Sequence, residues 1–273
     1  MRQFIRHYLL ALQFFSRVPV TGRLANWVGY SPAMLRASAA HFPGVGWLVG
    51  GVVAGLSWLL MQGFSGAVFA PLVVAVLGTV ASVLITGAFH EDGLADVADG
   101  LGGSLNRERA LEIMKDSRVG AFGAIAITLA LLLKVALLAQ LGSLGVPVLC
   151  SSIFLAHVVS RTWPLLMIRL LPHVGDLAGS KSKPLADQIA LPALGFAGLW
   201  CFLALALVGY AQTAINTIAI ACAILASALA FVCMWRWFAR RLGGFTGDCL
   251  GATQQVCELA FYLGMALGYG ASA

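Results

Sequence analysis

The sequence predicts an all-α integral membrane protein, a polytopic bundle of about seven transmembrane helices. Charged residues make up only 10% of the 273 positions and hydrophobic residues 60%, and the mean hydropathy is +0.91. Soluble domains carry roughly a quarter charged residues, so a soluble core of this length could not cover so much apolar surface. The net charge of +6 is therefore interpreted through membrane topology, and no basic cluster interleaved with aromatic residues indicates nucleic-acid binding.

Seven apolar stretches are long enough to cross a bilayer. A hydrocarbon core of about 30 Å needs about 20 apolar residues per helix. The stretches that meet this length are residues 43–62, 67–89, 119–141, 146–171, 189–211, 214–235 and 252–271. Gly and Ala are frequent within them, as close helix packing in lipid requires. Because no linker or shift in composition divides the chain, we expect residues 1–273 to form a single transmembrane domain.

The N-terminal region differs from these stretches. Within residues 1–20, apolar residues recur near helical spacing, at Phe4, Tyr8, Leu12 and Phe15, and basic residues lie among them. This pattern predicts an amphipathic helix, and two placements stay open for it: in the interface of an anionic leaflet, or packed on the bundle. Residues 21–42 are predicted to form an irregular basic connector.

The connections between the apolar stretches alternate in charge. Those near 62–66, 142–145 and 212–213 contain no charged residue, whereas the connections on the other side collect the Lys and Arg residues. By the positive-inside rule the charged side faces the cytoplasm, and an odd number of spans places the C-terminus outside. We therefore expect a multi-pass membrane protein whose acidic and basic connections face the cytoplasm.

Acidic residues concentrate in one connection, residues 90–118. Seven of the eleven acids of the chain lie there: Glu91, Asp92, Asp96, Asp99, Glu108, Glu112 and Asp116. Asp92, Asp96 and Asp99 stand at i, i+4 and i+7, so on a helix they share one face. Such carboxylates repel one another unless a cation lies between them, and oxygen ligands favour Mg²⁺ or Mn²⁺ over zinc. The alternative is a solvated acidic loop.

Residues 115–120 form a second candidate segment. Asp116 would add a metal ligand, and the planar guanidinium of Arg118 suits phosphate. The alternative is an ordinary helix start with Ser117 or Asp116 as the N-cap.

Residues 243–258 form a third candidate segment. Glycines before a helix start expose backbone N–H groups to phosphate, and Asp248 would complete the metal site. The alternative is a helix-capping loop. Acidic metal ligands together with phosphate contacts indicate phosphoryl transfer.

Two cations fall inside predicted spans. Charge within the membrane normally faces the bundle interior. Arg161 either reaches an anionic ligand near the acidic stretch or forms a structural ion pair, whereas Lys134 is expected to be structural or to snorkel.

The acidic motif carries a family resemblance. The run from His90 to Gly103, HEDGLADVADGLGG, resembles the signature of cobalamin (5′-phosphate) synthases, which are adenosylcobinamide-GDP ribazoletransferases. Residues 115–120 and 246–258 resemble further segments of that family in the same order, so the resemblance covers essentially the whole chain. It implies that α-ribazole or its 5′-phosphate attacks the pyrophosphate of adenosylcobinamide-GDP, releasing GMP and giving adenosylcobalamin or its 5′-phosphate. It also implies Mg²⁺ as cofactor, and other membrane enzymes of corrinoid synthesis as neighbours.

The residues and the resemblance together give a hypothesis for the site. The catalytic residues are Asp92, Asp96, Asp99 and Asp248. The metal ligands are drawn from Asp92, Asp96, Asp99, Asp116, Asp248 and Glu91. The residues that contact substrate are His90, Arg118, Arg161, Gly247 and Gln255.

Two other functions remain as alternatives. A CDP-alcohol phosphotransferase of phospholipid synthesis also uses spaced aspartates at a membrane face, but its usual Ala-Arg after the first Asp-Gly is absent here. An ion transporter would need acids along a permeation path, whereas these acids lie in a connection.

Overall fold

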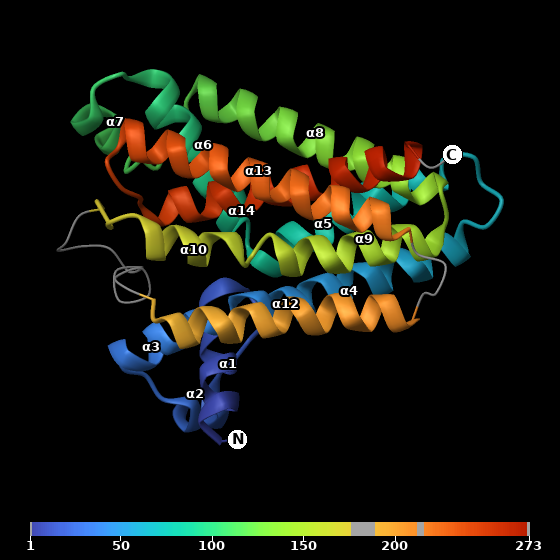
Figure 1. Ribbon diagram of the computed structural model, residues 1–273, viewed down its shortest axis with the longest axis horizontal. Coiled ribbons are helices and arrows are strands. Elements are labelled where there is room, and N and C mark those ends of the chain that lie inside the picture. Colours follow the sequence, from blue (N-terminus) through green and yellow to red (C-terminus); the bar gives the residue numbers. More distant parts are fainter. Residues whose placement is uncertain (1, 176–188, 212–215, 272–273) are drawn as a thin grey trace.

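The computed structural model describes residues 2–175, 189–211 and 216–271, and within them the chain is almost entirely helical (Figure 1). The N-terminal part contains α1 (Arg2–Phe15), α2 (Gly22–Val28), α3 (Pro32–Ser38) and the 3-10 turn η1 (Ala39–His41). The first half of the bundle contains α4 (Phe42–Gly63), α5 (Ala70–Thr86), α6 (Phe89–Gly103) and α7 (Arg107–Ile113). The second half contains α8 (Ala121–Ser143), α9 (Val146–Val159), α10 (Trp163–Leu170), α12 (Leu191–Ala211), α13 (Thr217–Arg241) and α14 (Gly247–Gly270).

The long helices run side by side along the bundle, and the polytopic all-α fold is confirmed. Five described stretches are long and apolar enough to cross a membrane, and the bent pair of α5 and α6 would make a sixth. All seven predicted stretches lie on helices, but α14 is not among these spans. The physical reason is its composition, because it carries a row of buried polar side chains: Thr253, Gln254, Gln255 and Glu258.

The N-terminal helix packs on the bundle through its second half, where Leu10, Ala11, Leu12 and Phe15 are buried. Phe15 stacks on Phe42 at the start of α4, with ring centroids 4.1 Å apart. The prediction of an irregular connector over residues 21–42 is wrong, since α2, α3 and η1 occupy most of it. Ser31 caps α3 by accepting a hydrogen bond from Met34 N (3.1 Å), and Pro32 follows at the first helical position, where its missing N–H costs nothing.

Small residues set the closest helix contacts, as the sequence predicts. On α14, Gly264 and Gly268 lie directly against Ala223 and Ala219 of α13, with no room for a Cβ atom. On α4, Gly46 lies against the backbone of α9 in the same way. In lipid, where apolar burial gives no advantage to helix association, such contacts let the backbones approach and gain dispersion energy.

A sharp turn separates α5 from α6. The two helices meet at 90°, and the turn consists of Gly87 (φ 68°) and Ala88 (φ 58°), both in the left-handed region. Ala88 is the one described residue other than glycine with positive φ, a conformation that costs an alanine about 1 kcal/mol. The backbone N–H of Arg17 holds the end of α5 by donating to Ile85 O at 2.7 Å. The turn directs the acidic helix α6 across one end of the bundle, where α7 and the start of α8 also lie.

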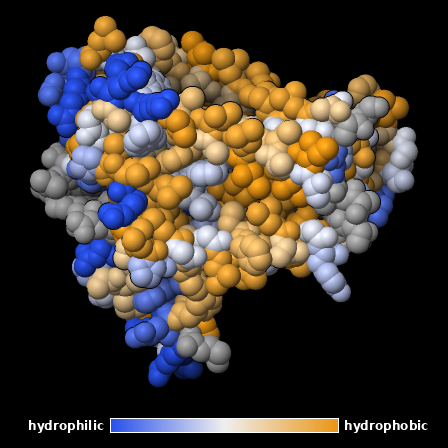
Figure 2. Space-filling view, in the orientation of Figure 1, coloured by the Kyte–Doolittle hydropathy of each residue, from blue (hydrophilic) through white to orange (hydrophobic). Residues whose placement is uncertain are grey.

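Hydrophilic residues gather at this end of the molecule, around α7 and around the N-terminal helices (Figure 2). The rest of the visible face along the helices is mainly hydrophobic. We call this end of the bundle the charged end.

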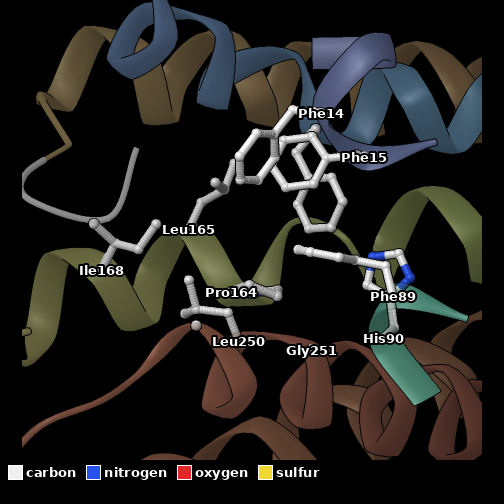
Figure 3. Close-up of a pocket in the computed structure, with 11 residues that line it drawn as sticks. Phe14, Phe15, Phe89, His90, Pro164, Leu165, Ile168, Leu250 and Gly251 are labelled. Atoms are coloured by element: carbon white, nitrogen blue, oxygen red, sulfur yellow. The ribbon is translucent and has the colours of Figure 1, made fainter. Parts of the chain in front are cut away.

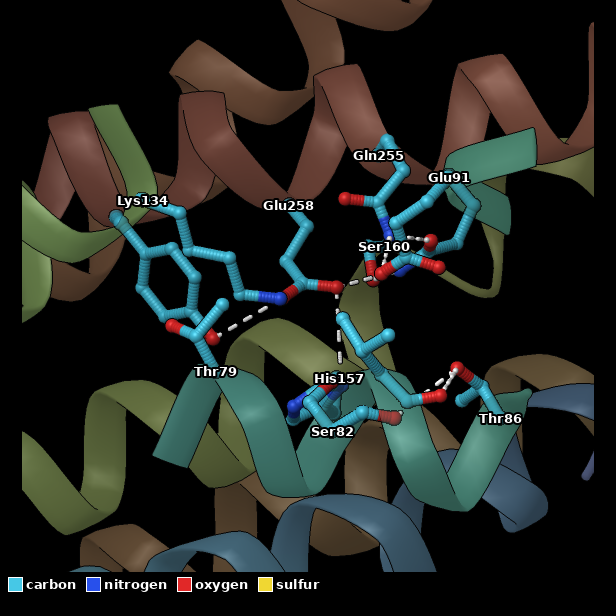
Figure 4. Close-up of polar contacts among 12 residues, drawn as sticks. Thr79, Ser82, Thr86, Glu91, Lys134, His157, Ser160, Gln255 and Glu258 are labelled. Carbon is cyan, nitrogen blue, oxygen red and sulfur yellow. Dashed lines mark hydrogen bonds and ion pairs between the residues drawn. The ribbon is translucent and has the colours of Figure 1, made fainter. Parts of the chain in front are cut away.

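Buried charges join α8, α9 and α14 inside the bundle (Figure 4). Lys134 Nζ lies 2.7 Å from Glu258 Oε1, and both side chains are at most 2% exposed. Glu258 also accepts hydrogen bonds from Gln254 Nε2 (2.6 Å) and Tyr262 OH (3.3 Å), and His157 Nδ1 lies 3.6 Å from its other oxygen. Lys134 is therefore a partner in a buried ion pair, in agreement with the structural role expected for it.

This ion pair generates a stability prediction. Lys134→Met should lower the free energy of unfolding by about 3–5 kcal/mol, because it leaves a buried carboxylate without its cation. The double variant Lys134→Met/Glu258→Gln should be less destabilised than this single variant, since the orphaned charge is removed. Chemical unfolding in detergent measures both, with Leu133→Met on an exposed position of α8 as the matched control. A double variant less stable than Lys134→Met would contradict this account.

Candidate functional site

The acidic helix α6 packs tightly against the start of α14. A Cβ atom on Gly93 would lie 2.8 Å from Asp248 O and 3.1 Å from its Cα, so only glycine allows this approach. One turn further along α14, Gly251 lies against the backbone of His90. These two contacts bring segments that are far apart in the sequence to one place at the charged end. The predicted meeting of the acidic motif with the third segment is thus found.

Three carboxylates of the predicted site lie near one another across this contact: Asp92 and Asp96 of α6, and Asp248 of α14. Asp92 is exposed and the other two are half-buried. Burial raises the pKa of Asp96 to about 7, and the charges of Asp248, Asp92 and Asp99 add to that rise. Burial also raises the pKa of Asp248, with Asp92 contributing and the Thr246 hydroxyl opposing. Mutual repulsion of this kind is what a cation relieves.

The donor set fits a hard cation, because it consists of carboxylate oxygens. The side chains are not arranged around one ion position, however: among the described residues, no three His, Cys, Asp or Glu side chains stand close enough to hold a metal. Metal binding therefore requires a change of rotamer in at least one of these carboxylates. Asp92 is exposed and free to make that change.

Asp99 binds the backbone at the start of α8, unlike the other carboxylates of the motif. Its Oδ2 accepts a hydrogen bond from Gly120 N at 2.7 Å, and its Oδ1 accepts one from Gly123 N at 2.8 Å. The carboxylate therefore caps the N-terminus of α8 from the neighbouring helix, where the helix dipole also favours a negative charge. The N-cap residue of α8 is Gly120, so neither Ser117 nor Asp116, which the sequence offered for this role, provides the cap.

Asp116 and Arg118 pair with each other in the segment before α8. Arg118 Nη2 lies 2.6 Å from Asp116 Oδ2, and Nε lies 3.0 Å from Oδ1. The guanidinium lowers the pKa of Asp116 to about 2. Both residues line an open groove that also contains Asp99. The structure thus places Asp116 beside Asp99, and does not bring it to Asp248.

The glycine-rich segment before α14 is anchored at two points. Phe245 N donates to Pro172 O (3.0 Å), and Val174 N donates to Phe245 O (2.9 Å), which forms an isolated bridge between His173 and Phe245. Thr246 is the N-cap of α14 and accepts a hydrogen bond from Cys249 N at 3.3 Å. Asp248 is therefore not the cap, and its carboxylate is available to the site, as is the adjoining half-buried Gly247.

Three residues assigned to the site point instead into the bundle. Glu91 Oε1 accepts a hydrogen bond from Gln255 Nε2 at 3.1 Å, and both side chains are buried. Arg161 is 1% exposed, donates to His157 O at 2.8 Å and lies over the Phe42 ring. Glu91 and Gln255 thus belong to the buried polar network that also contains Glu258 and His157 (Figure 4), and Arg161 joins it through His157.

Two arginines that the sequence did not assign to a contact hold the acidic region in place. Arg241 Nη2 donates to Ser104 O (2.6 Å) and Leu101 O (3.2 Å) at the end of α6. Arg107 Nε donates to Leu242 O (2.6 Å) just beyond α13. Sequence patterns carry no signal for these contacts, because the acceptors are backbone carbonyls of distant segments.

Comparison with known proteins gives one family. The model of the family described as cobalamin-5-phosphate synthase matches residues 7–266. A protein of Albidiferax ferrireducens named adenosylcobinamide-GDP ribazoletransferase is 67% identical over 279 residues, covering 98% of this chain and 100% of the relative. Proteins with the same name from Polaromonas naphthalenivorans and Vibrio cholerae are 63% and 40% identical, covering 98% and 94% of this chain and 99% and 91% of the relatives.

No solved structure matches the chain. The family match spans all three candidate segments, and the relatives align over nearly their whole length. The chain belongs to the cobalamin-5-phosphate synthase family.

Proposed function

We propose that this protein is a membrane-bound transferase that joins α-ribazole, or its 5′-phosphate, to adenosylcobinamide-GDP. The ribazole hydroxyl oxygen forms a bond to the corrinoid-side phosphorus of the pyrophosphate, the bond from that phosphorus to the bridging oxygen breaks, and GMP leaves. The product is adenosylcobalamin or its 5′-phosphate. The names of the relatives support the substrates. The observation that carries the chemistry is the convergence of carboxylates from α6 and α14 at the charged end.

The metal in this proposal is Mg²⁺, with Mn²⁺ as a substitute. Asp92, Asp96 and Asp248 would hold it, since they are the carboxylates that face one another across the helix contact. A divalent cation held there would neutralise charge on the pyrophosphate oxygens. Asp99 is assigned a positioning role, because it holds the start of α8 beside this cluster.

The protein's own residues position the two substrates. The start of α14 presents backbone N–H groups and the positive end of the helix dipole to phosphate beside Gly247. A carboxylate of the same cluster accepts the proton of the ribazole hydroxyl. Because the site lies at the charged end, we place it on the cytoplasmic side of a bacterial inner membrane, where the soluble ribazole and the released GMP exchange with the cytoplasm.

Loss of either site carboxylate should sharply lower turnover, and the effects of the two losses should not be additive. Asp96→Asn and Asp248→Asn should each lower the rate of GMP release by about a hundredfold or more, because each removes charge that the cation needs. The double variant should be little worse than either single one, since groups that act as a unit are not additive. Glu108→Gln, at an exposed acid of α7, is the matched control. Additive losses from Asp96→Asn and Asp248→Asn would show that the two residues serve separate sites.

Asp99→Asn should behave differently from Asp96→Asn. The new amide turns an N–H₂ group toward the N–H of Gly120 or Gly123, so one backbone donor loses its partner. We expect this to lower the free energy of unfolding by about 1–3 kcal/mol, with Asp96→Asn causing no such loss. Thermal unfolding in detergent compares the two variants. Equal stability of Asp99→Asn and the unaltered protein would remove the capping role.

The orientation can be tested with a membrane-impermeant maleimide. Leu105→Cys and Val68→Cys place thiols at two positions that are each 89% exposed, at opposite ends of the bundle. In intact cells the Val68→Cys thiol should react, whereas the Leu105→Cys thiol should react only after the cytoplasm is opened. The unaltered chain, with its six native cysteines, gives the background. Labelling of Leu105→Cys from outside would reverse the proposed topology.

A further inference from the structure

An open groove lies at the charged end of the bundle, between the end of α6, the helix α7 and the start of α8. Its volume is about 540 Å³, which is within the range of about 300–1,000 Å³ that small-molecule sites occupy. The enclosed pocket that Phe42, Phe89 and His90 line (Figure 3) holds only about 30 Å³, and no carboxylate stands among its described lining residues. The groove, unlike that pocket, is large enough for part of a substrate.

The groove continues the row of carboxylates on α6. Asp99 lines it, and Asp96 stands three residues earlier on the same face of the helix. The negative charge of Asp99 contributes to the raised pKa of Asp96, as expected for carboxylates that lie near each other. A ligand that reaches Asp96 with one end can therefore extend past Asp99 into the groove.

Two arginines line the groove, and each is paired with a neighbouring carboxylate. Arg109 Nη1 lies 2.9 Å from Glu112 Oε2, and Arg118 Nη2 lies 2.6 Å from Asp116 Oδ2. The two arginine side chains are 66% and 87% exposed. Exposed ion pairs contribute little free energy, so either guanidinium can exchange its carboxylate for a phosphate at small cost. The planar guanidinium binds phosphate through two parallel hydrogen bonds.

The carboxylates of these pairs keep other partners when the arginines turn to a ligand. Glu112 is exposed to water, and Asp116 Oδ1 still accepts a hydrogen bond from the backbone N–H of Arg118 at 3.1 Å. The charge of Asp99 is partly offset by the backbone N–H groups of Gly120 and Gly123, to which its two oxygens are bound. The groove can therefore accept an anion although acidic side chains also line it.

An apolar part of the wall adjoins the arginines. Val119 and Phe122 line the groove and are both exposed. The ring of Phe122 lies against Gly102, where a Cβ atom would stand only 2.8 Å from the ring. A purine base gains burial and stacking energy on an exposed aromatic ring of this kind. The groove thus combines two cations for phosphate with an aromatic surface for a base.

We propose that this groove binds the guanosine phosphate of adenosylcobinamide-GDP, the part that leaves as GMP. The inference rests on the proposed function and adds the place where the leaving group is held. The corrinoid-side phosphorus then lies beside Asp96 and Asp248. The phosphate of the leaving group lies at Arg109 and Arg118, with the guanine on Phe122.

The two guanidiniums would also act during transfer. When the bond between the corrinoid-side phosphorus and the bridging oxygen breaks, that oxygen stays with GMP, and the leaving phosphate gains one negative charge. Arg109 and Arg118 stabilise this charge as it develops. The phosphate of ribazole 5′-phosphate matches the groove less well, because α-ribazole without it serves the same reaction, whereas the phosphate of GMP takes part in every turnover.

The first test measures the binding of GMP and of guanosine to the full chain in detergent by calorimetry. GMP should bind at least about tenfold more tightly than guanosine, because its phosphate gains charge-assisted hydrogen bonds. In the double variant Arg109→Gln/Arg118→Gln, which keeps polar side chains without their charge, this difference should vanish. Arg23→Gln, at an exposed arginine of α2, is the matched control and should keep it. Equal binding of the two ligands to the unaltered protein, or an unchanged difference in the double variant, would overturn the proposal.

The second test fills the groove. Ala121→Trp adds bulk at an exposed lining position and should raise the Kd for GMP by about tenfold or more, because the indole occupies the space of the nucleotide. Ala124→Trp, at an exposed position of α8 outside the groove, is the matched control and should leave the Kd for GMP unchanged. An unchanged Kd for GMP in Ala121→Trp would sink the assignment. A loss of affinity confined to α-ribazole would do so too, and would give the groove to the other substrate.

A parallel assay separates this proposal from the function on which it rests. GMP release from adenosylcobinamide-GDP and α-ribazole by the unaltered protein tests the function alone. If GMP is released but its affinity is indifferent to the groove variants, the groove assignment fails and the function stands. If GMP binds in the groove but none is released from the two substrates, the groove is a nucleotide site and the proposed transfer fails. If GMP is neither released nor bound, both fail.

Discussion

The close approach of α6 to the first turns of α14 is the contact on which the site depends. Glycine at position 93 lets the backbone of α6 lie against Asp248, and glycine at position 251 does the same opposite His90. Packing at this distance buries Asp96 and brings other carboxylates near it, and burial together with their negative charges raises its pKa. The fold thus stabilises an arrangement whose electrostatic cost a divalent cation would relieve.

The buried polar network extends this contact into the bundle. The hydrogen bond from Gln255 to Glu91 fixes α6 on α14, and the pair of Glu258 with Lys134 fixes α14 on α8. The two buried cations, Lys134 and Arg161, lie near the two carboxylates of this network, Glu258 and Glu91. Breaking such a network leaves unpaired buried groups and is costly. The buried polar side chains that make α14 less apolar than the other long helices are therefore the ones that hold it against α6 and α8.

Local patterns predicted the helices, the shared face of the acidic motif and the meeting of that motif with the glycine-rich segment. They could not predict which carboxylate faces which partner, because that depends on packing between distant segments. Asp99 turns to the backbone of α8, and Glu91 turns to Gln255, although both stand in the same motif as Asp96. The sequence also could not predict that Phe42 and Phe89 pack around His90, since phenylalanines are common throughout an apolar chain. The family resemblance, in contrast, needed only the motif and is confirmed.

We propose that carboxylates of α6 and α14 hold one divalent cation together. Mn²⁺ binding followed by electron paramagnetic resonance tests it without any turnover, using the full chain in detergent. We expect the unaltered protein to bind Mn²⁺, and we expect the affinity to fall at least about tenfold both in Asp96→Asn and in Asp248→Asn, because each variant loses a ligand from the same ion. Full Mn²⁺ affinity in Asp248→Asn, with loss in Asp96→Asn alone, would contradict it and confine the metal to α6.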